Sequence, residues 1–374
     1  MKNNYIFLFL LIVLFISCKK GTEVLPDTDA PVVVVPIDTI NTATNKIRKI
    51  DSIRNLIKSN TAKYMLLSDS VWADNNGITL RVQMKNDFVT ANFVVQPQLE
   101  KRIYPGALIK GNTVVDLRYE PLTGYQQIPL HIYSTSPSFN IISKKVLPSL
   151  NAADGFIKES LGAANGGQVD SFIFQNGNPF QNYSEISINT RTSWDFATLV
   201  IVKPGDNGHI KKKTGFYVNF DLTLFSVMTD PVTEEGSFFA PDVNVSSIPN
   251  NPLIVSSVTY GRKAIIAVES DADFNSIKAA FQAIVNKNAS SADQKILEEA
   301  TITIFMNGFN QKDTESIKAA KGYEKVSLFA KTLLASGTYN KEDYGAPVEF
   351  FCNSVTDFAT ARYGFKFRLD YPVN

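Results

Sequence analysis

The stretch that most constrains this chain is residues 256–281, SSVTYGRKAIIAVESDADFNSIKAAF, because it fits two secondary structures. Its first half is an apolar, β-branched run typical of a buried strand. From Ser270 onward the apolar residues fit both a helix, with a stripe every three or four positions, and a strand, with a stripe every second position. The helical stripe contains Phe274, Ile277, Phe281, Ile284 and Val285; the strand stripe contains Ile277, Ala279, Phe281, Ala283 and Val285.

Cap and turn residues mark the ends of this ambiguous segment. Asp271 or Asp273 can cap a helix, and residues 290–292 predict a turn. Residues 296–306 then return, with Ile302 and Ile304 alternating against threonines. Taken alone, a segment that fits both periods is most simply a core helix, so both interpretations stay open.

An earlier pair of apolar arms predicts a β-hairpin. Residues 192–202 alternate, residues 204–208 (PGDNG) are a strong turn signal, and residues 216–222 alternate again. Each arm is about as long as a transmembrane β-strand, ~9–11 residues. The apolar face consists of Trp194, Phe196, Val200 and Val202 on the first arm and Phe216, Val218 and Phe220 on the return.

Composition limits the function classes. The chain has 374 residues, enough for two or three domains, and a formal net charge of +1, so nothing predicts a nucleic-acid partner. Two His and two Cys are too few for a metal cluster or a disulfide framework. No nucleophile elbow, P-loop or dinucleotide fingerprint is present, and His131 and His209 lack spaced ligand partners. The sequence predicts a sheet-rich α+β protein that is not an enzyme and needs no cofactor.

The N-terminus is expected to be a targeting signal. Lys2 supplies the charged start, and the apolar residues 5–16 are too few to span a bilayer stably. Phe15-Ile16-Ser17-Cys18 is similar to a bacterial lipobox, so residues 1–18 would be a lipoprotein signal peptide and Cys18 would carry lipid. The Pro-rich residues 19–45 would tether the protein to the outer membrane, on its periplasmic or its outer face. An ordinary signal peptide cut elsewhere is the alternative.

Other elements follow from local patterns. Residues 45–60 predict an amphipathic helix, and residues 77–95 predict strands. Pro105-Gly106 marks a turn. Residues 137–161 predict helices interrupted by Pro148, with residues 154–161 as the second piece. Cys352 is expected to be a buried thiol.

Five short motifs, in order from about residue 77 to the C-terminus, resemble those of the cholesterol-dependent (thiol-activated) cytolysins. They are RIYPGAL at residues 102–108, YVNFDL at 217–222, residues 238–242, SVTYGR at 257–262 and residues 346–351. The motif residues are Tyr104, Pro105, Gly106, Tyr260, Gly261 and Arg262.

The resemblance implies an α+β, MACPF/cytolysin-like fold, in which a twisted antiparallel central sheet is flanked by helical bundles that can convert to β-hairpins. It also implies an elongated protein with three discontinuous domains. The first would use residues 46–75, 104–185, 222–262 and 337–360; a thin β-domain would use 76–103 and 361–374; the pore-forming domain would use 186–221 and 263–336.

The resemblance further implies a pore-forming subunit that assembles into a ring with copies of itself. Residues 192–219 and 270–300 would become two membrane hairpins of one shared barrel, because closing a barrel satisfies every backbone group. The first hairpin would contribute the apolar face given above, and the second would contribute Phe274, Ile277, Phe281 and Val285.

The chain also departs from the family pattern. Asn307-Gly308 stands where the family has a Gly-Gly hinge, so only Gly308 keeps the freedom to adopt positive φ. Thr301 stands where an aromatic residue often sets strand register. The sequence stops at Asn374, about where the family's C-terminal membrane-binding domain begins, and Trp72 and Trp194 are its only tryptophans.

We therefore expect no cholesterol binding by the cytolysin route. Contact with the lipid membrane would come from lipidated Cys18, from a longer cytolysin-like partner, or from both. Proteolysis of the tether is expected to release the protein. The alternative is a non-lytic surface lipoprotein that uses the same fold for binding or structure.

Overall fold

The computed structural model describes residues 46–52, 54–55, 64–74, 77–86, 91–162, 171–190, 195–201, 208–230, 238–364 and 366–373. The chain divides into two compact units, Met1–Leu56 and Ile57–Asn374. The described residues of the first unit are helical, which confirms the helix expected between residues 45 and 60. The expected signal peptide, Cys18 and the tether lie outside the described residues.

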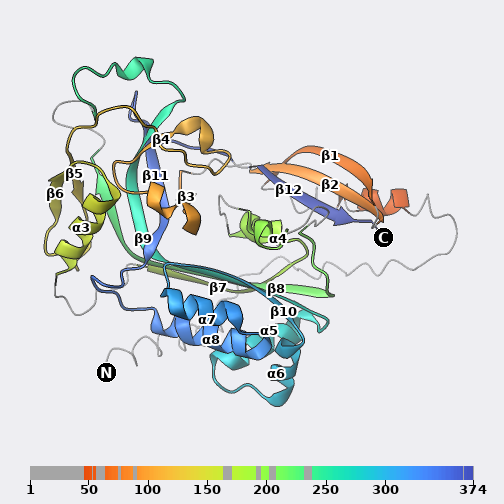
Figure 1. Cartoon of the computed structure of the whole chain (residues 1–374). Helices are drawn as coiled ribbons and strands as arrows, with labels where there is room; N and C mark the ends of the chain where they lie inside the picture. Colours follow the sequence, from red (N-terminus) through yellow and green to blue (C-terminus); the bar gives the residue numbers. More distant parts are fainter. Residues whose placement is uncertain are drawn as a thin grey trace, which may run out of the picture. The chain divides into compact units, whose positions relative to one another are not determined.

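The second unit contains a small antiparallel sheet (Figure 1). Its strands are β1 (Tyr64–Asp74), β2 (Gly77–Asn86) and β12 (Lys366–Pro372), in the order β1-β2-β12. The expected layout assigned β1 to the first domain, but β1 pairs with β2 from end to end. The domain layout otherwise stays a prediction.

A larger, nine-stranded sheet is built around two long antiparallel strands, β8 (Thr214–Thr229) and β9 (Pro252–Ser270). One half has the order β3-β11-β9-β8-β5-β6. In the other half, β10 pairs with β9 and β7 pairs with β8, so the strand order there is β7-β8-β9-β10. The shorter strands are β3 (Phe93–Val94), β4 (Leu108–Lys110), β5 (Leu130–Tyr133), β6 (Ser143–Val146), β7 (Ser171–Phe180), β10 (Thr301–Asn307) and β11 (Ala346–Ser354).

The ambiguous stretch of the sequence divides cleanly between strand and helix. Residues 258–270 of β9 are all buried, because both faces of the strand are covered, and a doubly covered strand is apolar along its whole length. The chain then leaves the sheet, and the Asp273 carboxylate accepts a hydrogen bond from the Ser276 amide at 3.0 Å. This N-cap starts helix α5 (Phe274–Val285) and confirms the cap expected there.

The helices lie outside the sheets. Figure 1 shows α5, α6, α7 and α8 on one face of strands β7–β10 and α4 on the other. Among the described residues, no helix has the length and apolar character needed to cross a membrane. The helices are α3 (Leu150–Leu161), α4 (Tyr183–Asn189), α5, α6 (Ser291–Glu298), α7 (Gln311–Ala319) and α8 (Gly322–Ala335), with 3-10 helices η1 (Pro97–Arg102), η2 (Gly111–Thr113), η3 (Phe196–Leu199) and η4 (Val245–Ser247).

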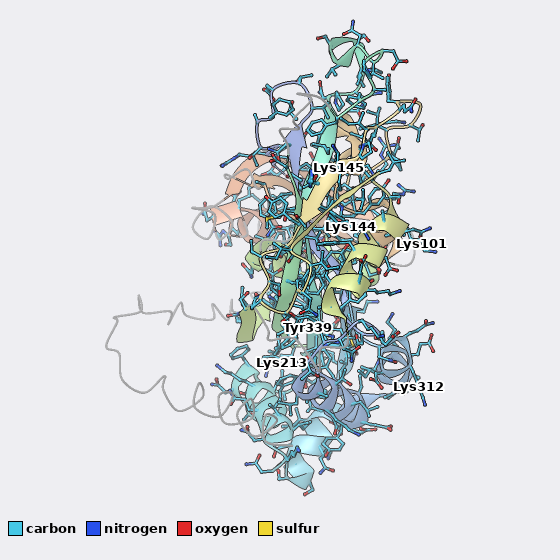
Figure 2. The ribbon with its side chains drawn as sticks, turned by 90° about the vertical axis from the view of Figure 1, so that its left-hand side faces the viewer. Lys101, Lys144, Lys145, Lys213, Lys312 and Tyr339 are labelled. Atoms are coloured by element: carbon cyan, nitrogen blue, oxygen red, sulfur yellow. The ribbon has the colours of Figure 1, made fainter. Side chains whose placement is uncertain are left out.

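One expected helix is wrong. Residues 137–147 do not form the first helical piece, because Ser143–Val146 pair with β5 as the outer strand β6. Figure 2 places Lys144 and Lys145 on this strand, where both side chains are exposed. Lysines on an outer strand discourage pairing with a further strand. The second piece, the Pro105-Gly106 turn and the burial of Cys352 are confirmed.

Candidate functional site

The candidate site is the half of the large sheet formed by β7, β8, β9 and β10. Two connecting segments flank it: residues 181–213 join β7 to β8, and residues 271–300 join β9 to β10. Each segment joins two antiparallel neighbours, and both leave the sheet at the same end, where Phe180 pairs with Gly215 and Glu269 pairs with Thr301. We call them segment 1 (residues 181–213) and segment 2 (residues 271–300).

Segment 1 covers one face of this half-sheet with α4 and η3. The Asn182 side chain caps α4 by accepting a hydrogen bond from the Ser184 amide at 2.9 Å. The Tyr183 and Phe196 rings stack with centroids 6.0 Å apart. They belong to an apolar cluster with sheet residues on the odd-numbered positions of the strands, namely Tyr217, Ile265, Ala267 and Phe305.

The first arm expected for this hairpin is not a strand over its described residues, 195–201. Phe196 lies in η3 and not in a strand, because the Asp195 side chain accepts a hydrogen bond from the Ala197 amide and starts a tight helical turn. Val200 follows η3 and packs, partly buried, against the same cluster. Trp194 and Val202 lie outside the described residues. The return arm is confirmed as a strand, but its apolar residues point to the opposite face from Phe196: they are Phe216, Val218 and Phe220 of β8.

Segment 2 covers that opposite face with α5 and α6. The Phe216 ring lies 5.9 Å from the Phe274 ring and 5.5 Å from the Phe281 ring, measured between centroids. Ile277 and Phe281 are buried, and Val285 is partly buried at the end of α5. The structure therefore brings two of the apolar residues expected for the second hairpin, Phe274 and Phe281, onto β8. The expected turn at Ser290 is instead the N-cap of α6, in a capping box with Asp293.

The expected hinge and one expected motif come together. Gly308 follows β10 with φ +78°, the conformation for which glycine was expected. The buried Arg262 guanidinium donates to the Gly308 carbonyl (Nε–O 3.2 Å) and to the carbonyls of Ser336 and Thr338. It also pairs with Asp343 at 2.8 Å. Arg262 thus holds the chain where it leaves the sheet after β10 and where it returns after α8.

Tyr260 and Gly261 precede this arginine in β9 and are buried. The other motif, Tyr104-Pro105-Gly106, lies at the opposite half of the sheet. Gly106 has φ +83°, and its amide donates to the Val255 carbonyl at 2.8 Å. This turn supports the start of β9.

Sequence reasoning missed two buried charged groups of this half-sheet, Lys263 and Glu269. Lys263 is 3 % exposed and pairs with Asp221 of β8, and Glu269 is 4 % exposed. A charged residue inside an apolar strand is itself a signal that a buried partner exists. Helix α4 was also missed, although the Asn182 to Glu185 spacing fits a capping box.

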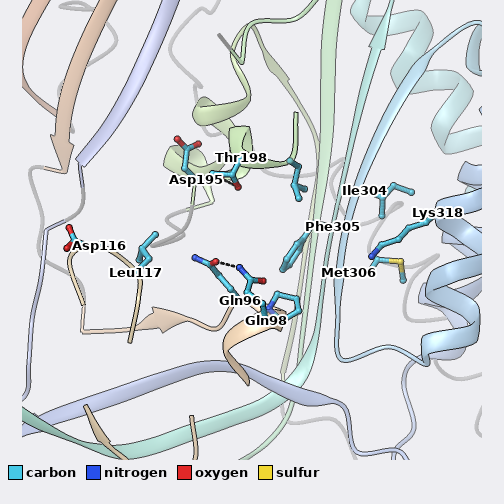
Figure 3. A pocket seen from close by; sticks show the side chains of 12 residues that line it. Gln96, Gln98, Asp116, Leu117, Asp195, Thr198, Ile304, Phe305, Met306 and Lys318 are labelled. Carbon is cyan, nitrogen blue, oxygen red and sulfur yellow. Dashed lines mark hydrogen bonds between the residues drawn. The ribbon is translucent and has the colours of Figure 1, made fainter. Parts of the chain in front are cut away.

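An open groove runs along the outer edge of β10 (Figure 3). Three consecutive residues of β10 line it, Ile304, Phe305 and Met306. Consecutive strand residues point to opposite faces of a sheet, so a groove that touches all three lies along the edge of the strand. Its volume is about 710 Å³. In the described part of the chain, no strand pairs with this edge of β10. The other walls come from η1, η3 and α7, through Gln96, Gln98, Thr198 and Lys318.

Comparison with known proteins agrees with this geometry. Residues 183–368, which begin at the first residue of α4, match the thiol-activated cytolysin family. Tetanolysin of Clostridium tetani is 22 % identical over 289 residues, which are 73 % of this chain and 54 % of tetanolysin. The chain thus spans about half the length of that relative.

Solved cytolysin structures share the fold. A non-hemolytic pneumolysin from Streptococcus pneumoniae matches with a TM-score of 0.58 and 16 % identity, over 83 % of this chain and 69 % of pneumolysin. Listeriolysin O matches with a TM-score of 0.56 and 18 % identity, over 90 % of this chain and 76 % of its own. The solved structures therefore show the cytolysin fold, and the match over residues 183–368 supports the thiol-activated cytolysin family for this chain.

Proposed function

We propose that this protein is a subunit of an oligomeric membrane pore, and that segments 1 and 2 convert into two β-hairpins of one shared barrel. One observation supports the proposal most strongly. Each segment connects two neighbouring antiparallel strands at the same end of the sheet, so an extended segment would prolong an existing strand pair. Ordinary loops between antiparallel strands are far shorter, about 2–5 residues.

The lengths of the segments fit this conversion. A transmembrane β-strand takes about 9–11 residues, so a hairpin takes about 20 residues and a turn. Residues 181–213 and 271–300 both exceed this. Segment 2 also keeps its period-two stripe, so Ile277, Phe281 and Val285 would share one face of a strand with exposed Ala279, whereas Phe274 would fall on the other face.

Self-assembly is supported by the outer edge of β10, with which no strand of the described residues pairs. An unpaired strand edge offers a row of amide and carbonyl groups to a further strand. The opposite edge of the half-sheet is β7, which pairs only with β8 in the described residues. A ring of subunits would join the β10 edge of one copy to the β7 edge of the next.

Membrane contact is proposed from the N-terminal sequence. We propose that lipidated Cys18 anchors the protein to a bacterial outer membrane and that cleavage of the tether releases it. A longer cytolysin-like partner would supply membrane binding. The protein would act without enzymatic chemistry, cofactor or nucleic acid.

A non-lytic surface lipoprotein is the second candidate. One structure with this fold is a pneumolysin described as non-hemolytic, so the fold alone does not establish lysis. In that case segments 1 and 2 would remain helical when the protein is on a membrane.

Paired arginine substitutions separate the two candidates. A charge at Phe281, which is 1 % exposed, would damage the soluble fold and decide nothing. Ala279 is exposed on α5 but would face lipid in a hairpin, so Ala279→Arg is expected to spare the fold and to cost about 2–4 kcal/mol at the bilayer centre. Gln282→Arg is the control, because position 282 falls on the other, lumen-facing side of the strand.

The measurement is dye release from phospholipid liposomes that carry the full chain anchored by lipidated Cys18, with electron micrographs of the same samples. On the pore proposal, wild type and Gln282→Arg release dye and form rings, whereas Ala279→Arg forms rings without release. Equal release by both variants would contradict the lipid-facing assignment of segment 2. Membrane-bound protein without rings or release would favour the non-lytic candidate.

A further inference from the structure

Glu269 is a buried carboxylate at the point where β9 gives way to segment 2. It is 4 % exposed and lies between Gly215 of β8 and Thr301 of β10 in the strand register. Its side chain points to the face that segment 1 covers, the same face as Ile265 and Ala267. An acidic group in such a place needs hydrogen-bond donors from its surroundings.

Those donors all come from segment 1. The Tyr183 hydroxyl donates to Glu269 Oε1 at 2.7 Å. The backbone amides of Lys211 and Lys212 donate to Oε2 at 2.6 Å and 3.2 Å. The Tyr183 hydroxyl also lies 3.4 Å from Thr303 Oγ1 of β10. Burial and the neighbouring carboxylate raise the pKa of Tyr183, so its hydroxyl stays protonated and donates.

These residues mark all four places where the segments join the sheet. Tyr183 opens α4 at the start of segment 1, and Lys211 and Lys212 lie at its end, just before β8. Glu269 lies just before segment 2, and Thr303 follows it in β10. We call this set, Tyr183, Lys211, Lys212, Glu269 and Thr303, the junction network.

Outside the junction network, the two segments depend on different surfaces. Segment 1 packs on the odd-numbered face of the strands, for example on Tyr217, and α5 of segment 2 packs on the even-numbered face, on Phe216. A second link, the ion pair between Lys212 and Asp271 at 2.8 Å, is at the surface, where Asp271 is 73 % exposed. Exposed ion pairs contribute little to stability.

We propose that Glu269 is a positioning residue that couples the release of the two segments, an inference that rests on the proposed conversion of both. Detaching the start of segment 1 removes Tyr183 from the carboxylate, and detaching its end removes the two amides. Moving the end of β9 with segment 2 removes the carboxylate from all three donors. Each event leaves the same buried charge under-bonded, which is unfavourable in an apolar surrounding. Release of one segment therefore weakens the hold on the other.

The coupling can be tested in solution, without a membrane. Hydrogen–deuterium exchange of the full chain reports the opening of each segment separately, and α3 reports global unfolding. Glu269→Gln is nearly isosteric, and Tyr183→Phe removes only the hydroxyl while keeping the ring in its cluster. Each variant is expected to accelerate exchange by about tenfold or more in both segments, as the loss of a charge-assisted buried hydrogen bond implies.

Three variants serve as controls. Two are expected to accelerate exchange in one segment only, and the third is expected to leave exchange in both segments unchanged. Ser184→Ala removes a contact to Asp195 inside segment 1, and Ser290→Ala removes the capping box inside segment 2. Each should accelerate exchange in its own segment alone. Asp271→Asn removes the exposed ion pair and should leave both segments within about twofold of wild type.

The coupling is wrong if Tyr183→Phe accelerates one segment and leaves the other unchanged, or has no effect on either. It is also wrong if Ser184→Ala opens both segments, because communication would then bypass the junction network. If Glu269→Gln accelerates hydrogen–deuterium exchange in α3 as much as in the segments, the substitution destabilises the whole chain. Tyr183→Phe then provides the test of coupling. Dye release from liposomes tests the pore proposal independently, since a protein that never makes pores can still show coupled exchange.

Discussion

Gly308 lies so close to Gly261 that a Cβ atom built on Gly308 would stand 2.0 Å from the Gly261 carbonyl oxygen. Gly345 makes a similar approach, with 2.3 Å between its Cβ position and the same oxygen. This is the place where β9 changes its neighbour from β10, which pairs up to Lys263, to β11, which pairs from Gly261. Three glycines let the chain leave and re-enter the sheet at one point.

Gly308→Ala should destabilise the protein strongly. It combines positive φ with a backbone clash that no side chain can relieve, and we expect a loss of more than about 3 kcal/mol in the free energy of unfolding. Gly124→Ala is the matched control, since Gly124 has φ +90° but nothing within 4 Å of its Cβ position. The control should cost only about 1 kcal/mol. Urea denaturation measures both, and equal losses would show that the close approach is unimportant.

Arg262→Ala should lower the free energy of unfolding by about 2–4 kcal/mol, because it leaves the carbonyls of Ser336 and Thr338 without their donor. Asp343→Ala removes the charged partner of the same guanidinium, but the Asp343 side chain is 53 % exposed, so we expect less than about 1 kcal/mol. A larger loss for Asp343→Ala than for Arg262→Ala would contradict the role given to the carbonyls.

Lys263 and Asp221 form an ion pair between β9 and β8 that is asymmetric in exposure, with 4 % of the Lys263 side chain and 23 % of the Asp221 side chain accessible. Asp221→Asn leaves the buried Lys263 ammonium group without its charged partner and should cost about 3–5 kcal/mol. Lys263→Met removes that charge and leaves Asp221 with the Asn219 amide at 2.7 Å, so it should cost less. Thermal or urea unfolding gives the ranking, and the reverse order would refute this account.

A pH-dependent contribution is expected from Asp154 of α3, which accepts a hydrogen bond from the Tyr344 hydroxyl. Burial acts to raise the pKa of Asp154, but the hydrogen bonds from Tyr344 and Lys158 outweigh it and lower the pKa below the ordinary 3.8. A lowered pKa in the folded state stabilises the protein above the ordinary value, and this stabilisation is lost as the pH falls through the folded pKa.

Tyr344→Phe removes this hydroxyl and keeps the ring contacts with Phe225 and Tyr260. The variant should be less stable than wild type at neutral pH, and the difference should shrink below about pH 4 as Asp154 takes up a proton. Urea unfolding at a series of pH values measures this convergence. A difference that stays constant down to about pH 3 would assign the effect to packing.

Local signals predicted strand β9, the start of α5 and the backbone conformation of Gly308 well. The apolar run of β9, the Asp273 cap and the positive φ of Gly308 each depend on a few neighbouring residues, so they can be derived from the chain alone. The period-two stripe of residues 192–202 was misleading, because the Asp195 cap starts a helical turn within it. The apolar residues of this stretch fit a strand and a helical turn equally well, and only their packing against Tyr217 distinguishes the two structures.

The contacts of the candidate site could not be predicted, because they depend on the register between strands that are far apart in the sequence. Tyr183 and Glu269 are 86 positions apart, and they meet because β8 lies between β7 and β9. Arg262 reaches Ser336 across 74 positions in the same way. The resemblance to a family identified the motif around Arg262, but it did not identify the carbonyls that the guanidinium binds.

The last strand pairs before the two segments, Phe180 with Gly215 and Glu269 with Thr301, have a kinetic consequence. A hairpin that forms from an unstructured chain must first close a loop and search for its register, and the entropy of that closure limits its rate. On the proposed conversion, the first strand pair of each hairpin already exists here, with its register fixed. An extending segment would add one hydrogen-bonded residue pair after another to this ordered end. No separate nucleation step would be needed.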